Sequence, residues 1–557
     1  MADVVTSDLI RSSLLYASEE MGIALRNSSY SPNIKERMDH SAAIFDSEGR
    51  LLAQAEHIPV HLGSLPWGLR NLLDYARKEK MEFEEGSMIA VNNPYIAGTH
   101  LNDITIVRPV FHHRNLVAFV ANKAHHADVG GRVPGSISVD ARVLQEEGLI
   151  IDPTFIMRRD EFENDIISLI VSNSRTPVER TGDLKAQVAA NHVGEKRTLE
   201  IIEKYGVESF RESSVRSFTY AEKMMQSRLS QMKPGVYSAE DFLEDPRGND
   251  IVLKVRVTVS SEGSLEFDYT GTHEQVENPI NSVFGVTISG VHYVVRTLVG
   301  EDVPANHGAF SALKVSSPTG TIINPTFPHP VAIGNLETSQ RNADLLFRAL
   351  SKVLPDKVPA ASGGSMNNIM MGGIHDGKAW AFYETMGVGL GARPKMDGLD
   401  GIQCNMTNTM NTPAEDIERS LPLILRRYEF RRDSSGAGRY RGGNGLIRMF
   451  EMTGESTTVT VVSDRQKHRP WGLGGALDGA SVEVVLHSKK GSSKEKLPCK
   501  CTRVLSRGEA IELRTAGGGG FGKPGSRKEA EIDEDLKDEL FSKSYVKKYY
   551  MSKVVRK

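Results

Sequence analysis

Residues 251–259 read Ile-Val-Leu-Lys-Val-Arg-Val-Thr-Val, with apolar side chains at every second position. Because successive side chains of a strand point to opposite faces, this pattern predicts a half-buried β-strand. A second strand, expected over 265–270 after a glycine turn, would complete a meander. Upstream, apolar residues recur at helical spacing in 7–26 and 183–205. This change of period near residue 235 predicts an α+β chain.

The remaining elements follow from the same periodicities and from turn residues. Strand patterns predict a hairpin over 40–45 and 50–54, strands near 88–92, 104–111 and 116–122, and later strands at 457–462 and 481–486. Helical patterns are found at 66–78, with Pro66 at the start, at 141–147 and at 339–353.

Composition excludes several classes of protein before any motif is considered. The 557 residues exceed what one compact core accommodates. A net charge of −3 gives no basic field that would recruit nucleic acid or anionic lipid. No apolar run is long enough to span a membrane, and the start lacks the pattern of a signal peptide. Three cysteines provide no disulfide framework, so we expect a cytoplasmic protein.

Glycine, with 51 residues, is the one amino acid that is clearly more frequent than in an average protein. Part of it lies in 517–523, Gly-Gly-Gly-Gly-Phe-Gly-Lys, which matches part of a phosphate-binding loop. Pro524 follows, where such a loop needs a Ser or Thr hydroxyl and the start of a helix. We therefore expect no ATP site here, and we expect the glycines to permit close backbone approach.

The densest polar cluster lies in two stretches, 93–103 and 124–131. His100 and Asp103 stand in a loop at a predicted strand start, and His125 ends a nearby strand. Two imidazoles and a carboxylate at adjacent strand ends suit a divalent metal such as zinc, manganese or iron, with positions left for water. Hydrogen-bonded structural histidines are the alternative.

Residues earlier in the chain extend this candidate site. Asp39, beside a predicted strand, is a candidate second carboxylate ligand. Arg37 is a candidate anion-binding residue through its planar guanidinium, and a salt bridge with Glu36 or Asp39 is the alternative. His57 and His61 are separated by Pro59, which excludes ligation from one helix face and favours a loop or a substrate-side wall. Structural roles or support of a ligand are favoured for both over direct ligation.

Several motifs resemble the hydantoinase B family. They lie collinearly over about residues 5 to 525 and comprise Glu36-Arg37-x-Asp39-x-Ser41, His57-x-Pro59-x-His61, Asn93-x-Tyr95-x-x-Gly98-Thr99-His100-x-x-Asp103, Ala124-His125-His126-x-Asp128, Gly182-Asp183, Met406-Thr407-Asn408, Arg441-Gly442-Gly443 and Ala516–Gly522. The family includes the B subunits of ATP-dependent hydantoinases, 5-oxoprolinase and caprolactamase, and a subunit of acetone carboxylase.

This resemblance implies a metal-bearing hydrolytic subunit that works with an A-type ATPase subunit in a hetero-oligomer. The ATPase would bind ATP and phosphorylate the carbonyl oxygen of a small cyclic amide. The metal ligands it implies are Asp39, His100, Asp103 and His125, with His126 and Asp128 as neighbouring acid/base groups. Arg37, His57 and His61 are left as candidate substrate-binding residues. The alternatives are the equivalent subunit of a ketone carboxylase and an assembly subunit with a structural metal.

One departure concerns the segment before Met406. Relatives carry histidines there, whereas this chain has Gln403-Cys404-Asn405. The resemblance therefore does not decide which substrate is used. It also does not decide whether the chain belongs to a hydrolase or a carboxylase.

Four regions follow from these observations. They are an N-terminal metal-site region (1–232), a β-rich region (233–354), a glycine-rich β region (355–525) and a charged helical tail (526–557). In the tail, acidic residues precede basic ones and Ile532, Leu536 and Leu540 form an apolar stripe. The tail is expected to be a solvated helix or a docking element for a partner subunit.

Overall fold

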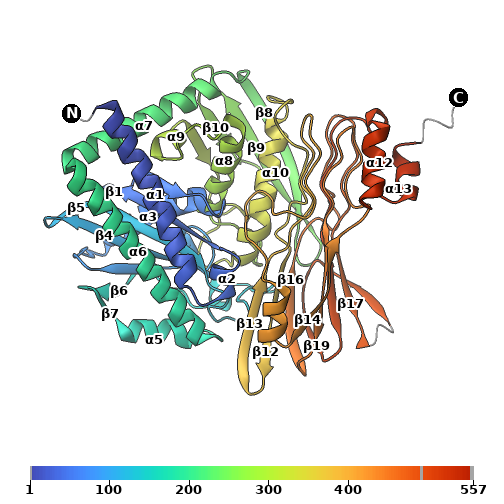
Figure 1. Cartoon of the computed structure of the whole chain (residues 1–557), viewed down its shortest axis with the longest axis horizontal. Coiled ribbons are helices and arrows are strands. Elements are labelled where there is room, and N and C mark those ends of the chain that lie inside the picture. Colours follow the sequence, from blue (N-terminus) through green and yellow to red (C-terminus); the bar gives the residue numbers. More distant parts are fainter. Residues whose placement is uncertain (1–2, 490–492, 552–557) are drawn as a thin grey trace.

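The computed structural model of the chain describes residues 3–489 and 493–551. Figure 1 shows the described residues as one elongated body containing helices and four β-sheets. Long helices gather on the N-terminal half, whereas strands and extended segments dominate the C-terminal half. The α+β class is confirmed.

The N-terminal sheet has the strand order β2-β1-β5-β4-β3-β6-β7, and every pair is antiparallel. Its strands are β1 (His40–Asp46), β2 (Leu51–Ala55), β3 (Met88–Val91), β4 (Asp103–His112), β5 (Asn115–His125), β6 (Thr154–Arg158) and β7 (Glu161–Phe162). The hairpin and the three following strands expected from the sequence are confirmed.

Helices cover both faces of this sheet. Helices α1 (Val4–Ser28) and α6 (Pro177–Tyr205) pack on one face, and α3 (His61–Lys78) packs on the other. Successive residues of β1 therefore enter different cores, with Ile44 beside α1 and Phe45 beside α3. Helix α7 (Val207–Leu229) packs against α1, outside the sheet.

Two expectations about helices are wrong. Helix α3 begins at His61, so Pro66 lies inside it and not at its start. Buried Leu62 and Leu65 extend the apolar face upstream, and their packing outweighs the one hydrogen bond that Pro66 removes. Residues 141–147 form only a 3₁₀ turn at Leu144–Glu146, because the Glu147 carboxylate accepts hydrogen bonds from distant backbone amides.

The central sheet confirms the alternating pattern of residues 251–259. Its order is β11-β10-β9-β8, with β8 (Gly235–Glu244), β9 (Asp250–Val259), β10 (Leu265–Asp268) and β11 (Leu313–Ser316). All five alternating apolar residues of β9 are buried, and α10 (Ser339–Leu350) packs on β8 and β9. Helix α8 (Phe284–Val299) packs against both α10 and α3, so the central region and the N-terminal region share one core.

Two further sheets pack around a second core in the C-terminal half. One has the order β13-β12-β16-β19 and the other β14-β15-β20-β17-β18. Their strands are β12 (Asn368–His375), β13 (Lys378–Glu384), β14 (Leu423–Phe430), β15 (Leu446–Met452), β16 (Ser456–Val462), β17 (Glu483–His487), β18 (Lys494–Leu497), β19 (Lys500–Ser506) and β20 (Ala510–Arg514). The short helices are α2 (Pro32–Lys35), α4 (Pro94–Ala97), α5 (Asn164–Ser172), α9 (His307–Phe310) and α11 (Ala414–Ser420).

Glycine-rich segments pack backbone against backbone between these sheets and the C-terminal helices. In Figure 1 they appear as thin extended ribbons running side by side. Gly443 donates a backbone hydrogen bond to Leu390, and Gly518 donates one to Gly443. A Cβ at Gly389 would lie 1.9 Å from the Gly443 carbonyl oxygen and 2.5 Å from the Gly518 nitrogen. The excess of glycine therefore allows segments distant in sequence to lie in direct backbone contact.

Gly389→Ala is expected to destabilise the protein by about 3 kcal/mol, because the new methyl group would push apart two backbone segments that have no side chains to adjust. The measurement is the free energy of unfolding in denaturant. Gly454→Ala is the matched control, since its Cβ would make only ordinary contacts, at 3.4 Å with Pro422 and 3.8 Å with the Thr457 hydroxyl. Equal stability of the two variants would contradict this packing.

The C-terminal tail packs on its own chain as two helices, α12 (Glu529–Lys537) and α13 (Lys543–Tyr549). Ile532, Phe541 and Val546 are buried together around Ala437. The carboxylate of Asp535 pairs with Arg441 at 2.9 Å and with Arg527 at 2.8 Å. The expectation of a solvated helix is therefore wrong, because its apolar stripe covers the glycine-rich region.

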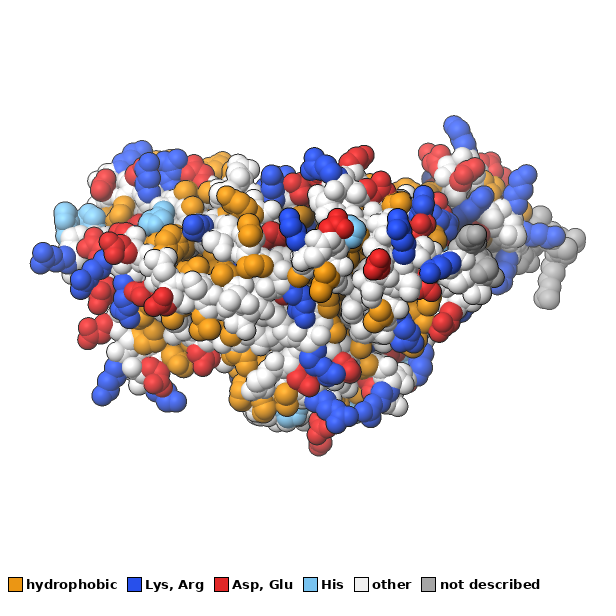
Figure 2. Space-filling view, turned by 90° about the horizontal axis from the view of Figure 1, so that it is seen from below, with side chains coloured by type: hydrophobic (Ala, Val, Ile, Leu, Met, Phe, Trp, Pro, Cys, Tyr) orange, Lys and Arg blue, Asp and Glu red, His pale blue; other side chains and the backbone are white. Residues whose placement is uncertain are grey.

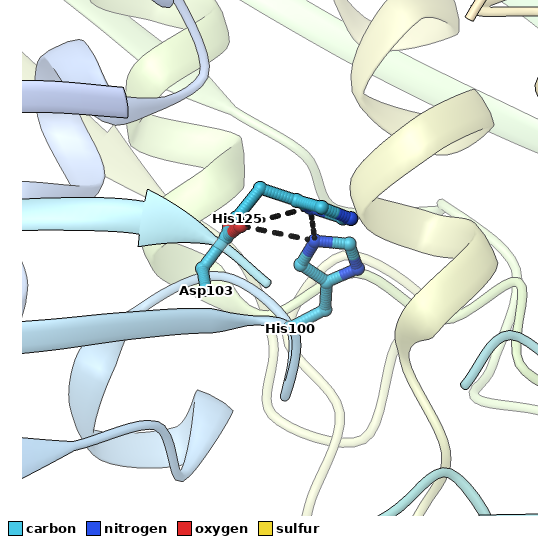
Figure 3. Close-up of side chains that lie close together, drawn as sticks. All are labelled: His100, Asp103 and His125. Carbon is cyan, nitrogen blue, oxygen red and sulfur yellow. Dashed lines mark hydrogen bonds and ion pairs between the residues drawn. The ribbon is translucent and has the colours of Figure 1, made fainter. Parts of the chain in front are cut away.

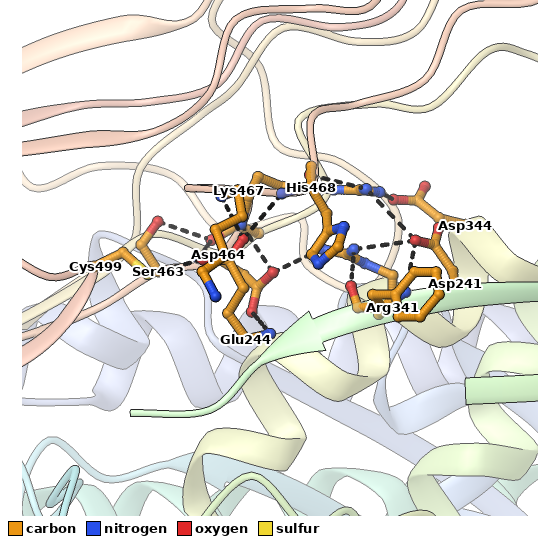
Figure 4. Close-up of polar contacts among 12 residues, drawn as sticks. Asp241, Glu244, Arg341, Asp344, Ser463, Asp464, Lys467, His468 and Cys499 are labelled. Atoms are coloured by element: carbon orange, nitrogen blue, oxygen red, sulfur yellow. Dashed lines mark hydrogen bonds and ion pairs between the residues drawn. The ribbon is translucent and has the colours of Figure 1, made fainter. Parts of the chain in front are cut away.

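A buried ion cluster joins the central sheet to the C-terminal half (Figure 4). We use this name for Asp241, Arg341, Asp344, Asp464, Arg465 and Lys500. Arg341 of α10 lies 2.9 Å from Asp464, which follows β16, and 3.3 Å from Asp241 of β8. Lys500 of β19 lies 2.6 Å from the other Asp464 oxygen. Side chains from four separate parts of the sequence thus neutralise one another where water is excluded.

The surface carries no single dominant charge on the face shown in Figure 2, where lysine and arginine are interspersed with aspartate and glutamate. This distribution agrees with the small net charge of the sequence. Among the residues that the structure describes, no helix combines the length and the apolarity that crossing a bilayer requires.

Candidate metal centre

Two adjacent strand ends bring the predicted polar cluster together. Asp103, the first residue of β4, pairs with His125, the last residue of β5. His100 lies in the turn before β4, just after α4 ends on Gly98 with a φ of 88°. That left-handed conformation favours glycine, and a Cβ there would lie 2.9 Å from the Ser64 carbonyl oxygen. The turn therefore places His100 at the same edge of the sheet.

The three side chains form a triangle of donor atoms, which we call the metal triad (Figure 3). His100 Nε2, Asp103 Oδ1 and His125 Nδ1 are 3.2 Å apart in all three pairs. Donors held about 2.1 Å from one ion are about 3.0 Å apart in octahedral geometry and about 3.4 Å apart in tetrahedral geometry. The observed spacing fits a divalent metal with further positions open.

The protonation states also suit a metal. Burial alone would raise the pKa of Asp103, but His100, His125 and His61 around it hold that pKa well below its usual range. Burial lowers the pKa of His125, which favours the neutral imidazole that a metal needs. The triad residues are 1–3% exposed, so water competes little for their donor atoms.

His61 supports the triad from the first turn of α3. Its Nε2 lies 3.4 Å from Asp103 Oδ2, and its Nδ1 lies 3.0 Å from the hydroxyl of Ser41 on β1. If Asp103 ligates a metal, a histidine in this place would orient its carboxylate. His57, in contrast, lies against α1, with its Nε2 3.3 Å from Glu19.

Asp39 and Arg37 lie beside the triad. The backbone carbonyl of Asp39 accepts a hydrogen bond from the His125 amide at 3.0 Å, and burial raises the pKa of its carboxyl group. The three triad donors lie within 4.8 Å of one another, a group that does not include the Asp39 carboxylate. The fully buried Arg37 lies 3.7 Å from Asp39 and 3.5 Å from Glu384. Its guanidinium thus ties the N-terminal region to the end of β13.

His126 and Asp128 lie close to the triad in sequence but face other partners. His126 Nε2 lies 2.9 Å from Gln187 of α6, and burial lowers the pKa of this histidine to about 4. Asp128 accepts hydrogen bonds from the amides of Gly130 and Gly135 and pairs with Arg175 at 2.9 Å. These contacts hold the loop that follows β5.

Two residues at the site were not predicted from the sequence. The ring of Tyr383 on β13 lies 4.4 Å from that of His125, and the Arg37 guanidinium carbon lies 5.0 Å from the centre of the Tyr383 ring. Lys123 donates to Ala97 O at 2.8 Å and to Thr99 Oγ1 at 3.0 Å, and burial lowers its pKa to about 8. Lys123 precedes His125 by two positions on one strand, a signal that was available in the sequence. Tyr383 offered none.

Residues 403–405, where this chain departs from its relatives, lie near Arg37. Gln403 Nε2 is 3.4 Å from the hydroxyl of Thr385, which also receives a hydrogen bond from Arg37. Cys404 is buried against Gln340, and Asn405 donates to Asp344 of the buried ion cluster at 3.0 Å. The segment therefore connects the surroundings of Arg37 to α10.

Comparisons with known proteins identify the family of this chain. The profile of the hydantoinase B/oxoprolinase family matches residues 3–524. The putative D-/L-hydantoinase B subunit of Pseudomonas sp. is 32% identical, over 97% of this chain and 93% of its own. The 5-oxoprolinase 1 of Arabidopsis thaliana is 34% identical over 94% of this chain, which spans only 42% of that protein.

A solved structure shows the same fold. The ATP-dependent caprolactamase of Pseudomonas jessenii superimposes with a TM-score of 0.91 at 28% identity, covering 99% of this chain and 96% of the other. The match with the family profile spans almost the whole chain up to the tail helices. The chain belongs to the hydantoinase B/oxoprolinase family.

Proposed function

We propose that this chain is the metal-bearing subunit of an ATP-dependent cyclic-amide hydrolase. The observation that carries the proposal is the metal triad, with three donors 3.2 Å apart in a buried site. Similarity to a hydantoinase B subunit and to an ATP-dependent caprolactamase supports a cyclic amide as the substrate. A hydantoin and 5-oxoproline are the substrates to test first.

His100, Asp103 and His125 would hold the ion, with Asp39 completing its surroundings. A bound divalent metal would supply Lewis acidity and lower the pKa of a water molecule toward neutrality. Zinc, manganese and iron all suit two imidazoles and a carboxylate. The other charged residues position these groups: His61 orients Asp103, and Arg37 positions Asp39 and Tyr383.

In this proposal His126 and Asp128 hold the loop after β5 in place. His57 holds its segment against α1. Their polar atoms pair with Gln187, Arg175 and Glu19. We therefore assign them to positioning.

ATP is assigned to a separate A-type subunit in a hetero-oligomer. The glycine-rich run 517–522 is packed against other backbone segments, and only a short 3₁₀ turn at Pro524–Ser526 follows it. This run thus lacks the helix start that a phosphate-binding loop requires. The hydantoinase relative from Pseudomonas sp. matches this chain nearly end to end, which supports a division of labour between two chains.

The test is to purify this chain with its co-encoded ATPase and to measure ring opening of 5-oxoproline and hydantoin. We expect turnover that requires ATP, both proteins and a divalent metal. Turnover by this chain alone would contradict the two-subunit assignment. Bicarbonate-dependent consumption of a ketone without lactam turnover would assign the chain to a carboxylase instead.

A further inference from the structure

A pocket of about 440 Å³ lies between the two halves of the molecule, and we call it the α2–β13 pocket. Helix α2 and the start of α6 line one side, and β13 and α11 line the other (Figure 1). Strand β13 explains the space. Its Trp380 and Phe382 pack in the second core, so Ala379, Ala381 and Tyr383 face the opposite way. The two alanines leave a volume that larger side chains would fill.

This pocket adjoins the metal triad. Tyr383 lines the pocket, and its ring centre lies 4.4 Å from that of His125. Ala127, two residues beyond His125, also lines it. On the opposite side, the carbonyl oxygen of Asn33 accepts a hydrogen bond from the Asp39 amide at 3.1 Å. The ring of Tyr383 thus forms a wall that the pocket and the triad share.

Two buried polar side chains in the lining have atoms without hydrogen-bond partners. Asn33 is 3% exposed and Thr412 is 4% exposed. Arg37 donates to Asn33 Oδ1 at 3.2 Å, which identifies the other terminal atom of Asn33 as the donor Nδ2. Within the described part of the chain, neither this Nδ2 nor the Thr412 hydroxyl has a partner. Because unbonded buried polar groups are costly, their place in the lining of a pocket indicates a polar ligand.

The charges around the pocket favour a neutral ligand. The charged residues that line it are Lys35, Glu36, Glu179, Asp416 and Arg419. Its two cations lie at the surface: Lys35 is exposed, and the Arg419 side chain is 78% exposed and pairs with Asp416 at 2.8 Å. The buried Arg37, next to Asn33, already pairs with Asp39 and Glu384. A carboxylate entering the pocket would therefore lose water without gaining a buried cation.

We propose that the α2–β13 pocket binds a neutral ring that contains an amide group, such as hydantoin or a simple lactam, and so selects the substrate. This inference rests on the proposed function and narrows its substrate class. The Asn33 amide donates to a ring carbonyl oxygen, the Thr412 hydroxyl bonds a second polar atom of the ring, and the ring's carbon atoms lie against Ala381 and Tyr383. Recognition alone is assigned here, and no bond forms or breaks in it.

The first test measures binding to the full chain without the ATPase, by ligand-observed NMR titration at neutral pH. The probes are hydantoin, 5-oxoproline and 2-pyrrolidone, which is the same five-membered lactam as 5-oxoproline without the carboxylate. We expect 2-pyrrolidone and hydantoin to bind at least about 10-fold more tightly than 5-oxoproline, because the pocket offers the carboxylate no unpaired buried cation. Equal or tighter binding of 5-oxoproline would overturn the neutral class.

Variants of the lining test whether the ring lies in this pocket. Thr412→Val keeps the shape of the side chain and removes a hydroxyl that bonds nothing in the described chain. It should weaken hydantoin binding by about 3–10-fold, the usual value of one neutral hydrogen bond. Thr457→Val is the matched control, because the Thr457 hydroxyl on β16 is also buried and unbonded but does not line the pocket. Ala381→Leu should fill the pocket and abolish binding, with the metal content unchanged.

Turnover by the complex with the ATPase separates this inference from the proposed function. We expect Thr412→Val to raise KM for hydantoin by the same 3–10-fold factor with little change in kcat. Hydrolysis of hydantoin with an unchanged KM in both Thr412→Val and Ala381→Leu would overturn the pocket assignment and leave the proposed function standing. A wild-type complex inactive on all cyclic amides would overturn the proposed function and this inference with it.

Discussion

His100→Ala is expected to lose the bound divalent metal and all metal-dependent ring opening. The triangle of donors becomes a pair, and an imidazole–carboxylate pair holds a divalent ion weakly. Loss of a residue that only orients a ligand already costs about 10–100-fold in metal affinity, so removing a ligand should cost more than about 100-fold. The measurement is metal stoichiometry after gel filtration, together with ATP-dependent lactam turnover.

His112→Ala is the matched control for this experiment. His112 ends the same strand, β4, that Asp103 begins, about 30 Å away at strand rise, and is half-buried. This variant should keep its metal and its activity. Metal retained at full stoichiometry in His100→Ala would refute the ligand assignment, provided that both variants show the circular dichroism of the wild type.

Arg341→Met is expected to destabilise the protein by about 3–5 kcal/mol, the usual effect of removing one partner from a buried ion pair. Arg341 is fully buried, and its loss leaves Asp241 without its closest cation and Asp464 with Lys500 alone. Methionine fills much of the volume, so the lost charge causes most of the effect. The measurement is the free energy of unfolding in urea at neutral pH.

Arg348→Met provides the control on the same helix. Arg348 is exposed and donates a hydrogen bond to the Glu240 carbonyl oxygen at 3.1 Å, so its removal should change stability by less than about 1 kcal/mol. A similar loss in both variants would show that the buried ion cluster in Figure 4 contributes nothing beyond ordinary helix packing.

Local patterns predicted most of the elements because their signals are local. The alternation in 251–259 defines β9 with its buried face, and the stripe in 7–26 defines α1. The failures occurred where distant contacts override local preference. Residues 141–147 have helical spacing, yet the Glu147 carboxylate accepts hydrogen bonds from the distant amides of Val331 and Ala332. The tail was expected to be a solvated helix or a docking element for a partner, yet its apolar residues pack around Ala437 of its own chain.

The sequence by itself predicted that His100, Asp103 and His125 lie together, because His100 and Asp103 stand at the start of one strand and His125 ends its hairpin neighbour. Such residues meet through short connections that strand pairing dictates. Only the tertiary structure decided what surrounds the triad. Tyr383 reaches it from β13, a distant part of the chain, because one shared core and the buried ion cluster hold these regions together. Long-range packing leaves no periodic signal in a single sequence, since it depends on which surfaces the whole chain must bury.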